Sequence, residues 1–261
     1  MSLGFVPTMG NLHAGHLSLI ERSIRENEKT IVSIYVNPLQ FGPNEDFDQY
    51  PRPLDADQAL LSQYDTVTVW TPTTTDLYPL GIDNACGIAA PKAMAQHWCG
   101  SSRPHFFDGV CTVVFRLCQQ VQPTRLYMGE KDYQQYSIIH ALMQDYQLPI
   151  AVVPCPIVRE ADGLAYSSRN QYLSSMDRPQ ATQLYKAIQA AQERVSCGET
   201  NPAVVIQTCQ AYLGSPLKID YVGIADPGSL QPIDRDIRPN DRLMLAAHLG
   251  KTRLIDNYRL S

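Results

Sequence analysis

Long apolar runs are missing from this 261-residue chain, and none of its apolar stretches approaches membrane-spanning length. The start of the sequence shows no signal peptide, so we expect no membrane partner. Charged residues make up only 18%, the formal net charge is −5, and Lys and Arg are scattered rather than grouped. This charge pattern argues against a nucleic-acid-binding surface, and we expect no nucleic-acid partner.

Paired cysteine motifs are missing as well. The seven cysteines are odd in number and include no C-x-x-C spacing. This usage indicates reduced, mostly buried thiols of a cytoplasmic protein. No internal repeat or low-complexity segment interrupts the chain, and its 44% hydrophobic fraction is typical of a globular protein with one large or two modest domains.

Strand-like and helix-like segments alternate in the first part of the chain. The strands are expected at residues 4–7, 30–36, 66–71, 125–129 and 150–158, and helices at residues 54–64, 110–121 and 132–146. This order predicts βαβ units and a parallel sheet. Ligands bind beyond the carboxyl ends of such strands, so the loops at residues 7–16, 37–42, 129–132 and 159–170 are expected in one neighbourhood.

The pattern changes after Asn170. Two helical stretches at residues 178–195 and 202–213 precede strand-like segments at 218–225, 242–248 and 252–258, with a turn at Asp226-Pro227-Gly228. These features predict an α/β domain over residues 1–170 and a small α+β domain over residues 171–261.

Two histidines open the first expected helix. His13 and His16 flank Gly15 directly after the first strand, and Leu17 begins a helical apolar spacing. A helix start offers free N–H groups and a positive dipole end, so one interpretation is a nucleotide phosphate site. The others are an ordinary polar helix start and a metal pair. The metal pair is the least favoured, because no Cys, Asp or Glu stands nearby at ligand spacing.

Three further loops carry polar side chains. Lys131 and Gln135 follow a strand and open a helix, where they could contact a phosphate and a substrate. Ser167, Ser168 and Arg169 suit triphosphate oxygens. Gln40 ends another strand and could bind a polar small molecule. Taken singly, the Lys131 loop is better explained as a solvated helix start. The segment around Ser167 is equally well explained as a polar interdomain linker, and Gln40 as an isolated loop glutamine carries little weight.

Together these segments resemble one family nearly end to end. They read FVPTMGNLHAGHLSLI at 5–20, VSIYVNPLQFG at 32–42, YPR at 50–52, GEKDYQQ at 129–135, SSRNQYL at 167–173 and GKTRLIDN at 250–257. The chain resembles the pantothenate synthetases, the pantoate–β-alanine ligases of coenzyme A biosynthesis. The HxGH element occurs in other nucleotidylyltransferases and some aminoacyl-tRNA synthetases, whereas the combination in this order is specific.

The resemblance implies a Rossmann-like domain followed by a smaller C-terminal lid domain, in a cytoplasmic homodimer. It implies an ATP-dependent ligase that requires Mg²⁺. Pantoate and ATP would form pantoyl adenylate and pyrophosphate, and the amine of β-alanine would then release pantothenate and AMP. Such chemistry depends on positioning and charge stabilisation and needs no protein nucleophile.

The resemblance also assigns residues. His16 corresponds to the catalytic residue, and Gln40 and Gln135 to the glutamines that bind pantoate or β-alanine. No metal ligand is assigned. The ATP contacts correspond to Met9, Gly10, Asn11, Leu12, His13, Ala14, Gly15, His16, Gly129, Glu130, Lys131, Asp132, Val158, Tyr166, Ser167, Ser168 and Arg169.

The chain departs from the family pattern at several positions. Family members usually have a longer segment before the first strand, so the N-terminal boundary of the first domain is left undefined here. The family pattern Arg-Pro-Gly-His-Phe-x-Gly corresponds to residues 103–109 of this chain. His105 stands in place of its first glycine and Phe106 in place of its histidine, so no role of the family's histidine is transferred to this chain. Tyr166 replaces a common Met. Asp57 stands where some relatives have an acidic residue near the metal.

Two other classes of function stay open. A nucleotidylyltransferase that stops at an adenylated product would share the histidine loop and the fold. A nucleotide-sensing or scaffold protein would retain the binding loops, but binding alone does not require His13, His16, Lys131 and Arg169 together. A tRNA synthetase is disfavoured by the acidic net charge and by the lack of an anticodon-binding region.

Overall fold

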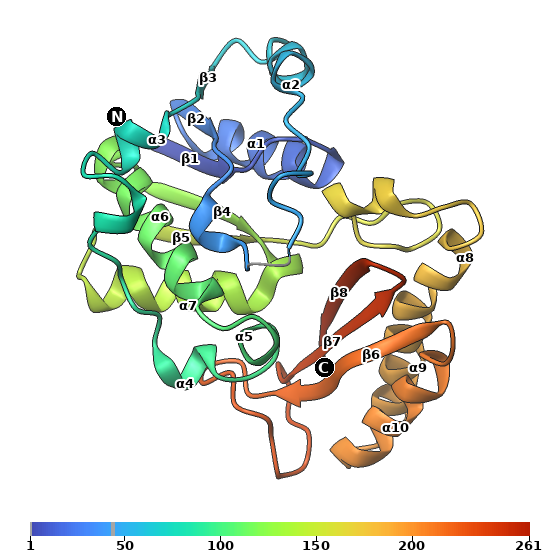
Figure 1. The fold of residues 1–261 in the computed structure, drawn as a ribbon. Helices are drawn as coiled ribbons and strands as arrows, with labels where there is room; N and C mark the ends of the chain where they lie inside the picture. Colours follow the sequence, from blue (N-terminus) through green and yellow to red (C-terminus); the bar gives the residue numbers. More distant parts are fainter. Residues whose placement is uncertain (1, 43–44) are drawn as a thin grey trace. The chain divides into compact units, whose positions relative to one another are not determined.

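The computed structural model describes residues 2–42 and 45–261. The chain forms two compact units (Figure 1). The second unit comprises Gln96–Trp98, Lys131–Tyr133 and Ile157–Ser261, and the first contains the rest of the chain. The domain boundary expected near residue 170 lies within the second unit and stays a prediction. No helix in the described ranges is long and apolar enough to cross a membrane.

The first unit contains the parallel sheet that the alternating pattern predicts. Its order is β3-β2-β1-β4-β5, and all four pairings are parallel. Successive residues of a strand face opposite sides of the sheet, and these strands are apolar on both sides, so both faces of the sheet need a cover. The strands are β1 (Leu3–Thr8), β2 (Lys29–Ile34), β3 (Val67–Trp70), β4 (Arg125–Gly129) and β5 (Ala151–Cys155).

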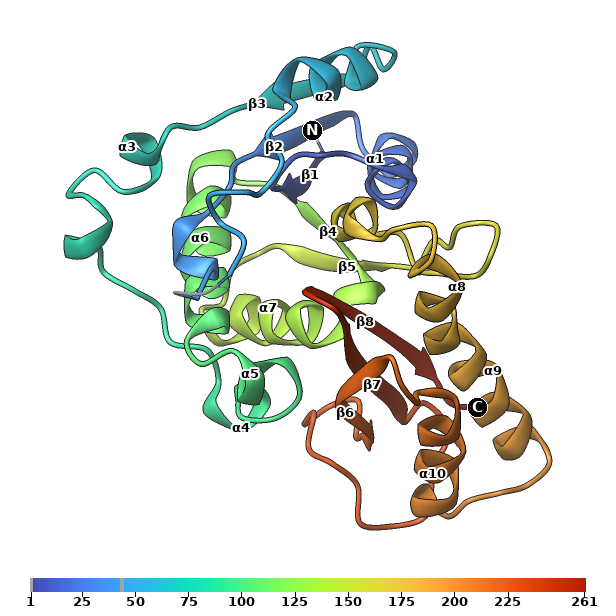
Figure 2. The same cartoon turned by 45° about the vertical axis from the view of Figure 1, so that its right-hand side comes forward.

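Helices supply that cover. Figure 1 and Figure 2 show α6 and α7 on one face of the sheet and α1 on the other. Ile20 of α1 is fully buried in a cluster with Val6 and Val32. The helices are α1 (Ala14–Glu26), α2 (Leu54–Leu61), α3 (Thr74–Leu77), α4 (Lys92–Ala95), α5 (Cys99–Ser102), α6 (Phe106–Val121) and α7 (Tyr133–Asp145), with short 3₁₀ turns at Pro38–Gln40, Ile82–Asn84 and Glu130–Asp132.

The second unit is α+β, as the sequence predicts. Strands β6 (Leu217–Ala225), β7 (Arg242–Leu249) and β8 (Thr252–Arg259) form an antiparallel sheet in that order. Its core joins apolar residues of the sheet to those of two helices, α9 (Gln183–Ser196) and α10 (Pro202–Tyr212). The 3₁₀ helix η4 (Ser168–Tyr172) precedes them.

The prediction of a single helix over residues 178–195 is wrong in one respect. The structure has α8 (Arg178–Ala181) and α9, separated at Thr182. The Thr182 hydroxyl donates to the carbonyl oxygen of Pro179 at 2.8 Å. Such a hydroxyl bond to the preceding turn accompanies the break but also occurs at Ser18 within the continuous helix α1, so it does not by itself explain the interruption.

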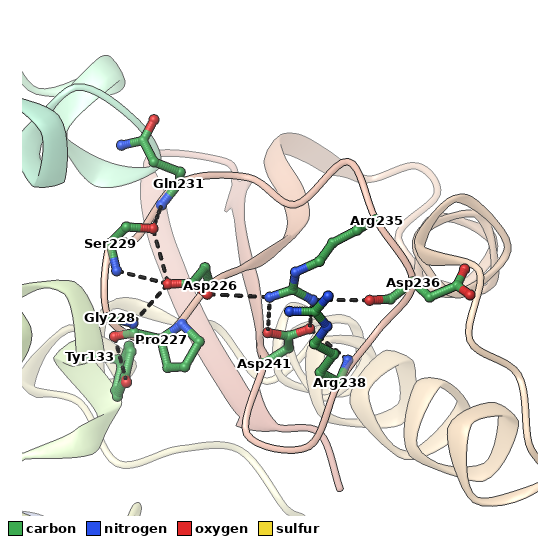
Figure 3. Close-up of polar contacts among 10 residues, drawn as sticks. All are labelled: Tyr133, Asp226, Pro227, Gly228, Ser229, Gln231, Arg235, Asp236, Arg238 and Asp241. Carbon is green, nitrogen blue, oxygen red and sulfur yellow. Dashed lines mark hydrogen bonds and ion pairs between the residues drawn. The ribbon is translucent and has the colours of Figure 1, made fainter.

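The turn expected at residues 226–228 is confirmed (Figure 3). The carboxylate of Asp226 accepts hydrogen bonds from the backbone N–H groups of Gly228 and Ser229, at 3.1 and 2.9 Å. The bond from Ser229 is the main reason that the pKa of Asp226 lies below its usual value. Arg235 joins the carboxylates of Asp226 and Asp241 and so ties the turn to the start of β7.

The cysteines are mostly buried, as expected. All seven are free thiols, and only Cys86 and Cys197 are exposed. Burial raises the pKa of both Cys111 and Cys118 to about 12. A thiol that stays protonated is a poor nucleophile, so these two cysteines act as core residues.

Position 105 has a backbone conformation that favours glycine. His105 has φ +66° and ψ −3°, in the left-handed region, directly before α6. A side chain in this region costs roughly 1–2 kcal/mol. The glycine of the family pattern at this position therefore has a conformational reason. Phe106 contacts Arg103, whose guanidinium carbon lies 3.6 Å from the ring centroid.

We therefore expect His105→Gly to raise the free energy of unfolding by up to about 1 kcal/mol, because glycine removes the strain but adds freedom to the unfolded chain. Urea-induced unfolding measures the change. The matched control is Gln119→Gly on the exposed side of α6, which should lower stability by about 1 kcal/mol. Equal destabilisation by both variants would show that position 105 carries no strain.

Candidate functional site

The histidine loop has the predicted strand–loop–helix geometry. It leaves β1 at Thr8 and enters α1 after His13, the N-cap residue. Gly10 and Asn11 have φ values of +82° and +53°, so the chain turns sharply between the two elements. Met9, Leu12, Ala14 and Gly15 complete the segment. This conformation presents a helix start at the carboxyl end of β1.

The two histidines interact directly. The backbone N–H of His13 donates to Nδ1 of His16 at 3.3 Å, and the ring centroids lie 4.0 Å apart. A neutral imidazole that accepts at Nδ1 carries its hydrogen on Nε2. Capping of α1 therefore fixes which ring nitrogen of His16 can donate a hydrogen bond.

A buried carboxylate holds this loop from the first turn of α2. Asp57 is 3% exposed, and its two oxygens each accept a backbone N–H, from Asn11 and Leu12, at 2.8 Å. A Cβ on Gly10 would lie 2.9 Å from Asp57 Oδ2 and 3.1 Å from a methyl of Ile34. Sequence reasoning named Asp57 only as an acidic residue near a possible metal. The structure makes it the residue that shapes the histidine loop.

Gln40 lies at the carboxyl end of β2, in the turn Pro38–Gln40. Its side-chain oxygen accepts from Asn37 Nδ2 at 3.1 Å. Asn37 is 1% exposed, and its own oxygen accepts from the Tyr78 hydroxyl at 2.8 Å. Burial raises the pKa of Tyr78, so this hydroxyl remains a donor. Asn37 and Tyr78 orient Gln40, and sequence reasoning assigned neither.

The first turn of α7, which follows the loop after β4, has two neighbouring glutamines with different surroundings. Gln134 is 2% exposed, and its amide accepts from the Cys99 N–H at 3.0 Å and donates to the Met94 carbonyl oxygen at 2.9 Å. Gln135 is only partly buried in the first turn of α7. Gln134 is therefore structural, which leaves Gln135 as the candidate for ligand contact. Gly129 ends β4, and Glu130 begins the 3₁₀ turn that precedes α7.

The first unit brings several candidates to one sheet edge. The strands β2, β1 and β4 are parallel neighbours, and the loops with Gln40, His16 and Gln135 follow their carboxyl ends. This is the neighbourhood expected for the loops at residues 7–16 and 37–42 and for the start of the loop at 129–132. The fourth loop, residues 159–170, belongs to the second unit, as do Lys131 and Asp132.

The candidates of the second unit lie on a short hairpin and a turn. The Tyr166 N–H donates to the Val158 carbonyl oxygen at 3.0 Å, and Arg159 and Ala165 form an antiparallel bridge. Ser167 then caps η4 by accepting from the Arg169 N–H at 3.3 Å, with Ser168 between them. Lys131 Nζ lies 3.6 Å from Asp132 Oδ2. No cluster of three or more His, Cys, Asp or Glu in the described ranges could hold a metal ion.

These features define a Rossmann-like α/β protein with an HxGH loop at the carboxyl edge of its parallel sheet. The sequence profile of the family "Pantoate-beta-alanine ligase" matches residues 1–259, and the chain belongs to this family.

Individual relatives agree with the family match. The chain is 48% identical to a "Bifunctional pantoate ligase/cytidylate kinase" of Synechococcus elongatus, over 99% of the chain and 49% of that protein. The chain therefore spans about half the length of that relative. It superposes on pantothenate synthetase from Thermus thermophilus with a TM-score of 0.94 and 42% identity, covering 99% and 93% of the two chains.

A third relative is a ligand complex. Pantoate-beta-alanine ligase from Francisella tularensis, complexed with beta-gamma ATP and beta-alanine, has a TM-score of 0.80 and 37% identity. The match covers 99% of this chain and 89% of that one.

Asp57→Asn should lower the free energy of unfolding by about 1–3 kcal/mol, because a buried backbone N–H loses its acceptor. The amides of Asn11 and Leu12 should exchange hydrogen faster, which mass spectrometry of the loop peptide measures. The matched control is Asp55→Asn in the same turn of α2, where the side chain is exposed. It should change stability by no more than about 0.5 kcal/mol. Similar losses in the two variants would refute the role of Asp57.

Proposed function

We propose that the chain is an ATP-dependent ligase that condenses pantoate with β-alanine. The observation that carries this proposal is the histidine loop, shaped by Asp57 at the same sheet edge as Gln40. Membership of the family supports it, as does the Francisella relative, which is complexed with beta-gamma ATP and beta-alanine. The proposed products are pantothenate, AMP and pyrophosphate.

The proposed reaction has two steps. A carboxylate oxygen of pantoate attacks the α-phosphorus of ATP, and the bond from that phosphorus to the bridging oxygen breaks, releasing pyrophosphate. The amine of β-alanine then attacks the acyl carbon, loses a proton and displaces AMP. Both steps need accurate positioning and stabilisation of negative charge.

His16 is the proposed catalytic residue of the first step. Because its Nδ1 accepts from the His13 backbone, Nε2 carries the hydrogen that would be donated to a phosphate oxygen as charge develops. Lys131 and Arg169 add positive charge. The remaining proposed ATP contacts are Met9 to Gly15, Gly129, Glu130, Asp132, Val158 and Tyr166 to Ser168.

Gln40 and Gln135 are the proposed contacts for pantoate or β-alanine. The Asn37 amide already bonds the side-chain oxygen of Gln40, which orients the Nε2 donors of Gln40 for a substrate oxygen. Gln135 offers a partly exposed amide, whereas its buried neighbour Gln134 is committed to backbone groups.

Mg²⁺ is proposed to enter with ATP. This ion commonly keeps several waters and binds through substrate phosphates with few protein carboxylates, so the described chain needs no multi-residue cage. Bound there, it would neutralise phosphate charge. Both oxygens of Asp57 accept backbone N–H groups, so no protein ligand is assigned. A cytoplasmic homodimer, with no nucleic-acid or membrane partner, completes the proposal.

The first test follows the order of chemistry. With pantoate, ATP and Mg²⁺ but no β-alanine, the protein should exchange labelled pyrophosphate into ATP. Adding β-alanine should then yield AMP and pantothenate in equal amounts. Exchange that strictly requires β-alanine would refute the two-step route, and an adenylated product that no amine consumes would favour a nucleotidylyltransferase.

The second test separates two roles of His16. His16→Ala should slow adenylate formation by about 10²–10⁴-fold while aminolysis of pre-formed pantoyl adenylate suffers much less, because no triphosphate is then present. His16→Asn keeps an acceptor near the His13 N–H but has no group at the Nε2 position. Rapid-quench measurement should therefore find both variants slow. Near-normal adenylation by His16→Asn would make His16 a capping residue rather than a catalytic one.

A further inference from the structure

The segment GKTRLIDN at residues 250–257 has no role in the proposed chemistry, yet it ends in two buried polar residues. Asp256 and Asn257 are 3% and 1% exposed, on β8 of the second unit. They pair with Leu245 and Met244 of β7. Successive strand residues point to opposite faces of a sheet, so the two side chains serve different neighbours.

Asp256 holds the hairpin that carries Val158 and Tyr166. Its carboxylate accepts two hydrogen bonds from the Arg159 guanidinium, at 2.6 and 3.0 Å. Arg159 also donates to the Gly163 carbonyl oxygen at 3.1 Å and lies over the ring of Tyr185 on α9. Burial raises the pKa of Asp256, and the paired guanidinium opposes that rise. The charged pair therefore fixes the base of the hairpin to the sheet.

Asn257 holds the turn that carries Lys131. Its Nδ2 donates to the Lys131 carbonyl oxygen at 2.9 Å, and its Oδ1 accepts from Arg242 at 3.4 Å. The Arg242 guanidinium carbon lies 3.9 Å from the ring centroid of Tyr133. The Tyr133 hydroxyl donates to the Pro227 carbonyl oxygen at 3.3 Å, in the turn that Asp226 rigidifies (Figure 3). Residues 131–133 are thus anchored at both ends.

We propose that Asp256 and Asn257 are positioning residues for nucleotide binding, each fixing one ATP loop from its own face of β8. The Asn257 N–H also donates to Asp256 Oδ1 at 2.8 Å, so the two anchors are linked. This inference rests on the proposed function, because Lys131 and the segment 166–169 are proposed ATP contacts. It makes the C-terminal sheet a scaffold for the nucleotide loops.

The test compares two isosteric variants with a matched control in the full chain. Asn257→Asp removes the amide donor and sets a carboxylate against the Lys131 carbonyl oxygen. Asp256→Asn removes the charge that Arg159 binds. The matched control is Arg253→Gln on the same strand, which breaks the ion pair of Arg253 with Asp220 of β6.

For Asn257→Asp we expect the KM for ATP to rise about tenfold, the factor for one lost hydrogen bond. For Asp256→Asn we expect a decrease of about 10- to 100-fold in kcat/KM for ATP. The KM for pantoate should stay unchanged in both, and Asn257→Gln, which keeps an amide donor, should recover part of the loss. Hydrogen exchange should accelerate at residues 130–133 in Asn257→Asp and at 159–166 in Asp256→Asn.

The outcomes separate the two proposals. A wild-type protein that forms no pantothenate from ATP, pantoate and β-alanine would overturn the proposed function, whereas the local pattern of hydrogen exchange would still support the anchoring. An active wild type with variants that match Arg253→Gln in ATP kinetics would overturn the positioning role. Faster hydrogen exchange that is spread evenly over β6, β7 and β8 in the variants would also overturn the positioning role, because that pattern indicates general destabilisation. If Asp256→Asn does not fold, the Asn257 pair of variants decides the matter alone.

Discussion

The loop between β1 and α1 depends on one buried carboxylate. Two successive left-handed residues, Gly10 and Asn11, make the sharp turn and leave backbone N–H groups that no helix or strand satisfies. Asp57 accepts the N–H groups of Asn11 and Leu12 at equal distances of 2.8 Å. A buried donor without a partner costs about 1–3 kcal/mol, so the loop conformation and the packing of α2 are coupled. The position of His16 follows from that coupling.

The same device recurs in the second unit. There the buried Asp256 accepts hydrogen bonds from Arg159 of the hairpin. The buried Asn257 donates a hydrogen bond to the carbonyl oxygen of Lys131 in the turn after β4. Loops that bind charged ligands gain accuracy when residues on regular elements hold them, because a misplaced donor weakens the interaction steeply. Here the supporting residues lie on α2 and β8, elements with no proposed ligand contact.

Much of the fold could be predicted because its signals are local. The five parallel strands are short apolar runs, and α6 and α7 show clear helical spacing. The break at Thr182 escapes prediction because the helical spacing continues across it. The supporting residues of the site escape it for another reason, since Asp57 lies 46 residues from Asn11 and acquires its role only once distant elements have packed. Burial reveals such a residue, because an Asp or Asn below 5% exposure must have partners.

The segment from Arg103 to Gly109 contains two residues that support the turn with Gln40 and one residue that does not. Arg103 donates to the Gln40 carbonyl oxygen at 2.9 Å and pairs with Glu45, while a Cβ on Gly109 would lie 2.0 Å from the Leu39 carbonyl oxygen. Both therefore support the turn that carries Gln40, and both match the family pattern. His105 between them is exposed and tolerates a left-handed backbone at a modest energetic cost. His105 thus departs from the pattern at a position where its own backbone conformation is at stake, whereas Arg103 and Gly109 follow the pattern where the turn that carries Gln40 rests against them.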